Sequence, residues 1–179
     1  SKYNTLKNEG NLNNEIGVPL TLFRLEKTHE AAVIEMGMSG FEEISRMTKA
    51  VKPDVAIISN IGVSHIEKLG SREGITNIGF SHIENLGSQE GILEAKLEIL
   101  NGMKADAPLI LNADDDMLIT VCQDTHPVTY YGINNEKSMF KAFEITSKED
   151  ETEMSVGFRN GGSGRVSLPF PGRHNVYNA

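Results

Sequence analysis

The sequence predicts an α/β protein with a mostly parallel central sheet flanked by helices and a short antiparallel β extension near the C-terminus. Up to about residue 133, short apolar runs alternate with stretches whose apolar residues recur at helical spacing, which is typical of βαβ units. Beyond that point, short strand-like segments follow one another directly. The composition, 39% hydrophobic and 23% charged over 179 residues, is that of an ordinary globular domain.

Buried strands are predicted where apolar residues are continuous rather than alternating, a pattern that fits a parallel sheet covered on both faces. These segments are residues 31–36, 55–59 and 108–112, and residues 3–6 and 128–131 are two further short strands. Helices are predicted where apolar residues recur every three or four positions. They cover residues 19–25, 41–50 and 91–103, with a further helical stretch at 117–122. Residues 11–17 are polar and bounded by glycine, which predicts a loop.

The C-terminal extension is predicted to consist of antiparallel strands at residues 142–145, 153–158 and 165–168. Residues 161–164 read Gly-Gly-Ser-Gly, which predicts a tight turn between the last two of them.

Composition excludes several classes of protein. The formal net charge is −8, from 17 Lys and Arg against 25 Asp and Glu, and no basic cluster occurs, which argues against a nucleic-acid binder. A single cysteine, Cys122, excludes a disulfide framework and a multi-cysteine zinc site. No apolar run approaches the ~20 residues that span a bilayer, and no secretory signal is visible. We therefore expect a cytoplasmic protein without membrane insertion.

One internal repeat is present. Residues 60–75 recur 17 positions later as residues 77–92, and only three of the 16 positions differ. Stacking arrays need about three or more repeats, so we interpret the pair as a local tandem duplication. Each residue of a site built from this segment therefore has two candidates, above all the histidines His65 and His82.

Polar residues follow two of the predicted strands. Glu35 comes at the end of the strand at 31–36, and Asn60 and His65 follow the strand at 55–59. In open parallel sheets ligands bind beyond the carboxyl ends of the strands, where a carboxylate suits Mg²⁺ and a neutral imidazole can bind a metal or a phosphate. A turn carboxylate and a structural histidine are the plainer alternatives.

Other candidates lie on later elements. Lys96 lies on the helix at 91–103, where spacing alone favours a solvated lysine paired with neighbouring acids. The acids of residues 112–116 follow a strand and could bind a cation, although helix capping is favoured for at least one. Asn175 and Asn178 would share a helix face and could read a nucleobase edge or cap the helix. The phosphate loop G-x-x-x-x-G-K-[ST] does not occur in these 179 residues.

Taken together, these motifs resemble the central ATP-binding domain of the Mur ligases, over nearly the whole chain. In the family's order they are residues 10–21 (GNLNNEIGVPLT), 35–39 (EMGMS), 59–62 (SNIG), 65–67 (HIE), 95–99 (AKLEI), 111–115 (LNADD) and 171–179 (PGRHNVYNA). The Met-Gly-Met after Glu35 and the form of the HIE segment point to the members that add a D-alanyl-D-alanine dipeptide.

The resemblance implies an enzyme of peptidoglycan synthesis that uses ATP and Mg²⁺. ATP would phosphorylate the carboxylate of a UDP-N-acetylmuramoyl-tripeptide, and the amine of D-alanyl-D-alanine would attack the acyl phosphate. By resemblance, Mg²⁺ would be bound by Glu35, by His65 or His82, and by Lys96 in a carbamylated form. The candidate catalytic residues would be Lys96, His65 and His82. His65 keeps the anchorage to the strand and is slightly preferred, whereas His82 keeps the family-like spacing of 14 residues to Lys96.

The resemblance also assigns ligand contacts outside the metal. The cofactor-binding residues would be Asn178, which approaches the adenine, together with Asn60 and Asn175. Asn13 and Asn14 would lie near the muramoyl substrate, and the protein is expected to be monomeric.

The resemblance further implies that residues 1–179 form a fragment of the family's central domain. The first βα unit with its phosphate loop, the N-terminal UDP-binding domain and the C-terminal domain would be absent, so the fragment alone should bind ATP weakly and be inactive. Two alternatives stay open at this point. One is a non-catalytic truncated scaffold, and the other is a related Mur ligase that adds a different amino acid.

Overall fold

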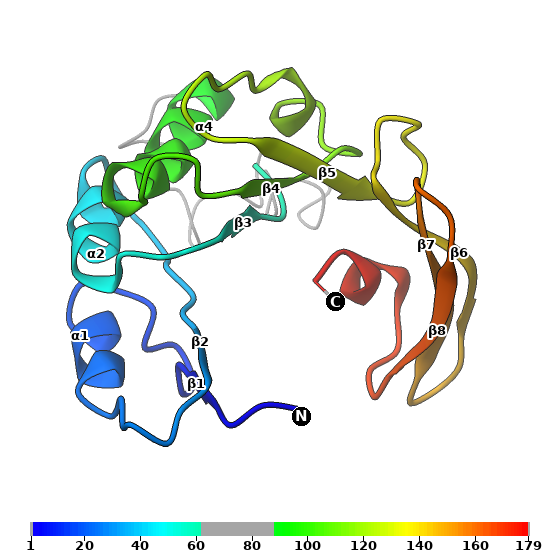
Figure 1. The fold of residues 1–179 in the computed structure, drawn as a ribbon, viewed down its shortest axis with the longest axis horizontal. Coiled ribbons are helices and arrows are strands. Elements are labelled where there is room, and N and C mark those ends of the chain that lie inside the picture. Colours follow the sequence, from blue (N-terminus) through cyan, green and yellow to red (C-terminus); the bar gives the residue numbers. More distant parts are fainter. Residues whose placement is uncertain (1, 62–87, 179) are drawn as a thin grey trace, which may run out of the picture. The chain divides into compact units, whose positions relative to one another are not determined.

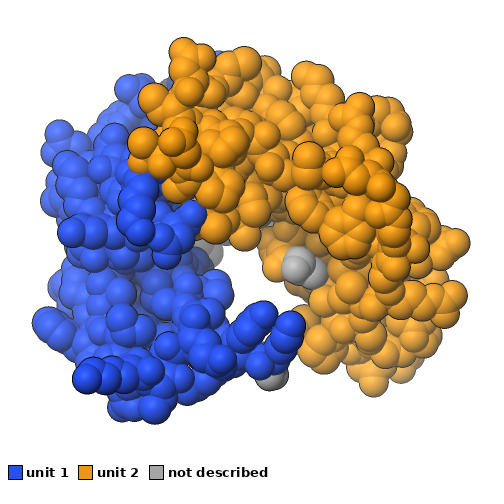
Figure 2. Space-filling model, in the orientation of Figure 1, with its two compact units in different colours: residues 1–54, 62–104 blue, residues 55–61, 105–179 orange. Residues whose placement is uncertain are grey.

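The computed structural model describes residues 2–61 and 88–178 of the chain (Figure 1). It divides into two compact units, one of residues 1–54 and 62–104 and the other of residues 55–61 and 105–179 (Figure 2). The duplicated segment, with His65 and His82, lies almost entirely outside the described residues.

The first unit contains a two-stranded parallel sheet and a group of helices. In chain order its described elements are β1 (Thr5–Lys7), α1 (Gly17–Leu22), β2 (Ala31–Val33), α2 (Glu43–Val51), α4 (Gln89–Leu97) and η3 (Glu98–Gly102). β1 pairs with β2 so that Leu6 lies opposite Ala32. The helix α4 begins where the sequence supplies a capping residue, because the Ser88 hydroxyl accepts a hydrogen bond from the N–H of Gly91 at 3.2 Å.

The core of this unit lies between α1 and α2. Val18 of α1 packs with Ile44 and Met47 of α2, and all three side chains are buried. The partly buried residues around them include Ile34 and Ile99, which bring the end of β2 and the 3₁₀ helix η3 to the same cluster. The helical spacing of apolar residues in α2 is therefore explained by one buried face.

The contact between η3 and α2 is close enough to require glycine at position 102. A Cβ atom on Gly102 would lie 2.7 Å from the backbone nitrogen of Lys49 and still closer to the carbonyl of Thr48. We expect Gly102→Ala to lower the free energy of unfolding by about 3 kcal/mol, because backbone rather than a flexible side chain must move. Urea denaturation followed by circular dichroism measures this change.

Gly40→Ala is the matched control, since a Cβ at Gly40 would meet only the Glu43 carboxylate, at 3.7 Å. It should change the free energy of unfolding by less than about 1 kcal/mol. Equal stability of the two variants would show that η3 and α2 can separate without cost.

The second unit is built on a six-stranded sheet in the order β3-β4-β5-β6-β7-β8. Its strands are β3 (Ala56–Ile58), β4 (Leu109–Asn112), β5 (Val128–Gly132), β6 (Phe140–Ser147), β7 (Thr152–Phe158) and β8 (Ser163–Leu168). The first four strands are parallel, and β7 and β8 pair antiparallel. Two 3₁₀ helices, η4 (Leu118–Thr120) and η5 (Arg173–Asn178), complete the unit.

Two groups of side chains form the interior of this unit. Leu109 and Leu111 of β4 are fully buried, as expected for a central parallel strand. At the antiparallel end, Ala142 and Met154 form a cluster with Val176 of η5. This second cluster ties the last segment of the chain to the β extension.

The predicted fold class is confirmed, with corrections to individual elements. The helix predicted at 91–103 is α-helical only to Leu97 and continues as the 3₁₀ helix η3, and the stretch at 117–122 is reduced to η4. The segments at 31–36 and 55–59 do form strands, at residues 31–33 and 56–58, but the prediction that both of their faces are covered was wrong. Val33 is 66% exposed and Ile57 is 61% exposed.

The exposure of Ile57 has a simple geometric reason. Alternate residues of a strand face opposite sides of the sheet, so Ala56 and Ile58 are buried while Ile57 faces the other side. That side opens onto a cavity within the unit, and Ile57 lines it. Within the described residues, no helix is long and apolar enough to cross a membrane.

Candidate functional site

Glu35 lies just beyond β2, where the sequence placed a metal ligand. Its carboxylate is exposed, and Oε1 accepts a hydrogen bond of 2.8 Å from the side-chain amide of Asn13. Asn8 fixes the backbone of the same residue, since its Oδ1 accepts the Glu35 N–H at 2.8 Å and its amide donates to the Glu35 carbonyl at 3.2 Å. The carboxylate is thus oriented by Asn13, a residue that was expected to lie near a different ligand.

The backbone supports this contact. The N–H of Gly37 donates to the carbonyl of Asn13 at 2.7 Å. A Cβ on Gly37 would come within 3.1 Å of the Asn13 amide. Glycine at position 37 therefore leaves room for the amide that holds Glu35.

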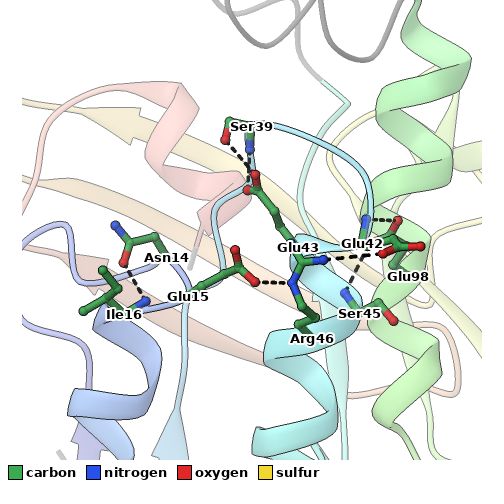
Figure 3. Close-up of polar contacts among 9 residues, drawn as sticks. All are labelled: Asn14, Glu15, Ile16, Ser39, Glu42, Glu43, Ser45, Arg46 and Glu98. Carbon is green, nitrogen blue, oxygen red and sulfur yellow. Dashed lines mark hydrogen bonds and ion pairs between the residues drawn. The ribbon is translucent and has the colours of Figure 1, made fainter.

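Asn14 has a structural role at the start of α1. Its Oδ1 accepts hydrogen bonds from the N–H of Ile16 at 3.1 Å and of Gly17 at 2.8 Å (Figure 3). These are donors that a helix leaves without internal partners. The predicted substrate contact of Asn14 stays a prediction, and any such contact would have to use its amide N–H groups.

Lys96 lies in the last turn of α4, and the next turn is attached to α2. Glu98 accepts a hydrogen bond from the N–H of Glu42 at 2.6 Å and another from the N–H of Ser45 at 3.1 Å, so its carboxylate caps the first turn of α2 (Figure 3). In addition, the Thr48 hydroxyl donates to the carbonyl of Ile99 at 2.8 Å. The segment that carries Lys96 therefore has a fixed place on α2.

Exposed charges surround this capped turn. Arg46 of α2 forms ion pairs with Glu15 and Glu42, and Glu43 accepts hydrogen bonds of 2.8 Å from the N–H and hydroxyl of Ser39 (Figure 3). The hydrogen bond from Arg46 lowers the pKa of Glu15 below its ordinary value. Because Arg46, Glu15 and Glu42 are exposed, their ion pairs contribute little to stability.

The complete metal site falls partly outside the described residues. His65 and His82 are not among them, and the described residues contain no group of three or more His, Cys, Asp and Glu side chains that could hold a metal ion. Furthermore, β2 pairs with β1 and β3 pairs with β4, so these two strands lie in separate sheets. The metal-ligand set of Glu35, Lys96 and a histidine stays a prediction.

In the second unit, the last residue of β4 and the residues after it are bonded to the segments that follow β3 and β5. The Asn112 amide donates to the carbonyl of Ser59 after β3 at 3.0 Å, and Asp115 accepts the N–H of Ile61 at 2.8 Å. Asp115 also accepts the N–H groups of Met117 and Leu118 at 3.0 Å each, and so bonds to the start of η4 although Met117 is the N-cap residue. Asn60, the predicted cofactor contact, is exposed within this anchored segment.

Asp114 is the most heavily bonded carboxylate of this unit. It accepts the N–H groups of Ile133 at 2.6 Å, Asn134 at 3.0 Å and Asn135 at 2.8 Å, together with the Tyr177 hydroxyl at 3.1 Å. Burial alone would raise the pKa of Asp114, but these donors outweigh it and lower the pKa below its ordinary value. Asp114 is therefore ionised at neutral pH.

A cavity of about 680 Å³ opens on the face of the sheet that carries Ile57. Its wall is mostly apolar, and its polar groups come from the ends of β3 and β5 and from η5. These polar lining residues are Ser59, Tyr131, Tyr177 and Asn178. A large, mostly apolar cavity with a few polar groups is the usual form of a small-molecule site.

The two asparagines of η5 differ. Asn178 is exposed and lines the cavity. Asn175 is not among the lining residues, and its amide donates to the carbonyl of Pro171 at 2.7 Å. The Asn175 amide therefore bonds to the turn before η5. The contact of Asn175 with a cofactor stays a prediction.

Comparison with known families decides which class of protein this is. The model of the Mur ligase middle domain matches residues 1–76 and again residues 74–179. The chain belongs to the Mur ligase family. The two matches meet inside the duplication, so each includes one copy of the repeated segment.

Two similar proteins are both D-alanyl-D-alanine-adding ligases or MurF proteins by name. The UDP-N-acetylmuramoyl-tripeptide–D-alanyl-D-alanine ligase of Bacillus subtilis is 36% identical over 180 residues, which cover 100% of this chain and 34% of that enzyme. A crystal structure of MurF from Acinetobacter baumannii has a TM-score of 0.78 at 32% identity and covers 98% of this chain and 35% of that one. The chain therefore spans about a third of the length of these relatives.

A third relative shows the fold in a nucleotide-bound protein. The MurF ligase of Thermotoga maritima, solved in complex with ADP, has a TM-score of 0.74 at 24% identity and covers 99% of this chain and 37% of that one. The sequence resemblance to the family, and to the members that add D-alanyl-D-alanine, is confirmed by these comparisons.

Several positioning contacts were missed by sequence reasoning. Asn8, Tyr131 and Tyr177 were not singled out, because each acts on residues far away in the chain, and Glu98 was noted only as part of the AKLEI motif. Asp114 was noted only as part of an acidic cluster. The signal available for Asp114 was the LNADD segment, whose residues hold three strand ends together.

Proposed function

We propose that the chain is the ATP-binding middle domain of a ligase that adds D-alanyl-D-alanine to a UDP-N-acetylmuramoyl-tripeptide in peptidoglycan synthesis. The observation that carries this proposal is the 36% identity to the Bacillus subtilis enzyme across the whole of the chain. The similarity of fold to MurF of Acinetobacter baumannii supports it independently. In this proposal the enzyme works as a monomer in the cytoplasm.

The proposed metal site uses oxygen ligands. Mg²⁺ prefers carboxylate oxygens and keeps several waters, and the exposed Glu35 carboxylate, oriented by Asn13, is suited to that chemistry. Bound Mg²⁺ would neutralise the phosphates of ATP. Besides Glu35, the proposed ligands of the cation are carbamylated Lys96 and one histidine, His65 or His82.

Lys96 would contribute through a carbamate. Its neutral amine attacks CO₂, a C–N bond forms, and a proton is released, so that a cationic side chain becomes an anion with two oxygens. This product fits beside a divalent cation, whereas an ammonium group would repel it. Glu98, bonded to the first turn of α2, would hold the end of α4 in place for this role.

The nucleotide would be bound by the second unit. Asn178 lies in the wall of the cavity, and an asparagine amide offers both a donor and an acceptor to a base edge. Asn60 follows β3 at the carboxyl end of a parallel strand, where nucleotides bind in open sheets of this type. Asn175 is the remaining proposed contact to the cofactor, and Asn13 and Asn14 are proposed for the muramoyl substrate.

A coupled assay tests this proposal in the complete ligase that contains the chain. We expect ADP release only when UDP-N-acetylmuramoyl-tripeptide, D-alanyl-D-alanine, ATP and Mg²⁺ are all present. Reactions with glutamate or diaminopimelate in place of the dipeptide are the matched controls and should release no ADP. Product formed with either amino acid would assign the chain to another Mur ligase, and no turnover with any substrate would favour a non-catalytic scaffold.

A further inference from the structure

The residue that precedes Asn178 is held at both of its ends. The Tyr177 hydroxyl donates to Asp114 Oδ2 at 3.1 Å. The Tyr177 carbonyl, whose carbon forms the peptide bond to Asn178, accepts a hydrogen bond of 2.8 Å from the Tyr131 hydroxyl. The position of the Asn178 backbone is therefore determined by contacts to Tyr131 of β5 and to Asp114, two residues after β4, and not by η5 alone.

Asp114 is itself fixed by the chain that follows β5. Its Oδ1 accepts the N–H of Asn135, its Oδ2 accepts the N–H of Ile133, and Asn134 donates to both oxygens. Gly132 allows this approach, because a Cβ there would lie 3.0 Å from Asp114 Oδ2. The carboxylate thus links the turn after β5 to the aromatic residue of η5.

The bonding of Asp114 argues against direct contact with a ligand. Both oxygens are occupied by backbone N–H donors, and Oδ2 also accepts the Tyr177 hydroxyl. A metal ion would have to displace at least one of these hydrogen bonds. Burial, together with the charge of nearby groups, raises the pKa of Tyr131 to about 12, so its hydroxyl remains a donor at neutral pH.

We propose that Asp114 and Tyr131 are positioning residues that set Asn178 for recognition of the nucleotide base, although neither is assigned a contact with that base. The inference rests on the proposed function, in which Asn178 approaches the adenine. It deepens that function by naming the groups on which discrimination between purine bases depends. Tyr177 is the link, because it is bonded to both positioning residues.

Tyr177→Phe in the complete ligase tests this role, since it removes one hydroxyl and leaves the ring in place. Loss of a hydrogen bond to a charged acceptor should raise the KM for ATP about tenfold. The preference for ATP over GTP should fall by a similar factor, whereas kcat and the KM for the tripeptide substrate should stay within about twofold of wild type. A purely structural role would not change base preference.

Tyr130→Phe is the matched control. Its hydroxyl donates to the carbonyl of Val121 at 3.0 Å in the same unit, and Tyr130 does not line the cavity. This variant should keep the wild-type KM for ATP and the wild-type base preference. A shift as large as that of Tyr177→Phe would overturn the proposal, because it would show that any tyrosine hydroxyl of the unit matters equally.

Asp114→Asn and the double variant with Tyr177→Phe provide the second measurement. If Tyr177 acts through Asp114, the double variant should have the same KM for ATP as Asp114→Asn alone, and additive effects would contradict the proposal. An unchanged KM and base preference in Tyr177→Phe, with an active wild type, would overturn this inference alone. A wild-type ligase without ATP-dependent activity would overturn the proposed function and the inference with it.

Discussion

Lys96→Arg should lower the kcat of the complete ligase by about 1,000-fold, which is the scale observed when a group that stabilises charge in a transition state is removed. Arginine is a good helix former, so α4 should be retained. However, the guanidinium group stays protonated and does not form the carbamate. The variant would therefore place a permanent positive charge where the proposed site requires an anion. Steady-state kinetics with saturating ATP and Mg²⁺ measures the loss.

Lys49→Arg is the control, because Lys49 is an exposed lysine in the last turn of α2 in the same unit. It should have wild-type kinetics. A second readout is carbon-13 NMR after incubation with labelled bicarbonate, which should show a carbamate signal in the wild type and in Lys49→Arg but not in Lys96→Arg. Wild-type activity of Lys96→Arg would eliminate the carbamate from the mechanism.

The fold was largely predictable because patterns in the sequence reflect local geometry. The continuous apolar residues of β4 identified a buried parallel strand, and Leu109 and Leu111 are fully buried. The same pattern overestimated the burial of Ile57 and Val33. An apolar run shows that both faces of a strand can be covered, but it does not show that both faces are covered. Glycines at 161 and 162, both with positive φ, correctly marked the turn before β8.

The residues of the candidate site stay a prediction, and the contacts among them could not be predicted from the sequence. Sequence motifs pointed separately to Asn13 and Glu35, and only the structure shows that the Asn13 amide bonds to the Glu35 carboxylate, 22 residues away. Glu98 was noted only as part of the AKLEI motif, yet it caps a helix that begins more than 50 residues earlier. Spacing along the chain cannot reveal such partners, because they depend on how distant segments pack.

The contact between Asn13 and Glu35 makes Glu35→Gln an informative substitution. Glutamine keeps an oxygen that can accept the Asn13 N–H, which is 2.8 Å from Glu35 Oε1, so the loop after β2 should keep its shape. The negative charge that would bind Mg²⁺ is lost. We expect kcat/KM to fall by about 100-fold and the Mg²⁺ concentration for half-maximal activity to rise, since weakened metal sites typically lose 10- to 100-fold in affinity or activity.

Glu30→Gln is the matched control at the opposite end of β2. Glu30 precedes Ala31 and accepts the N–H of Asn4 at 2.8 Å, so the substitution removes the same charge from the same strand while leaving an acceptor oxygen. Its Mg²⁺ dependence should equal that of the wild type. If Glu35→Gln and Glu30→Gln raise the Mg²⁺ requirement equally, the rise is caused by the change in net charge. The loss of a metal ligand would instead depend on the position of the substituted residue. A rise in the Mg²⁺ requirement confined to Glu35→Gln would mean that the carboxylate held by Asn13 binds the cation. Asn13, which orients that carboxylate, would then connect the proposed substrate contact to the metal.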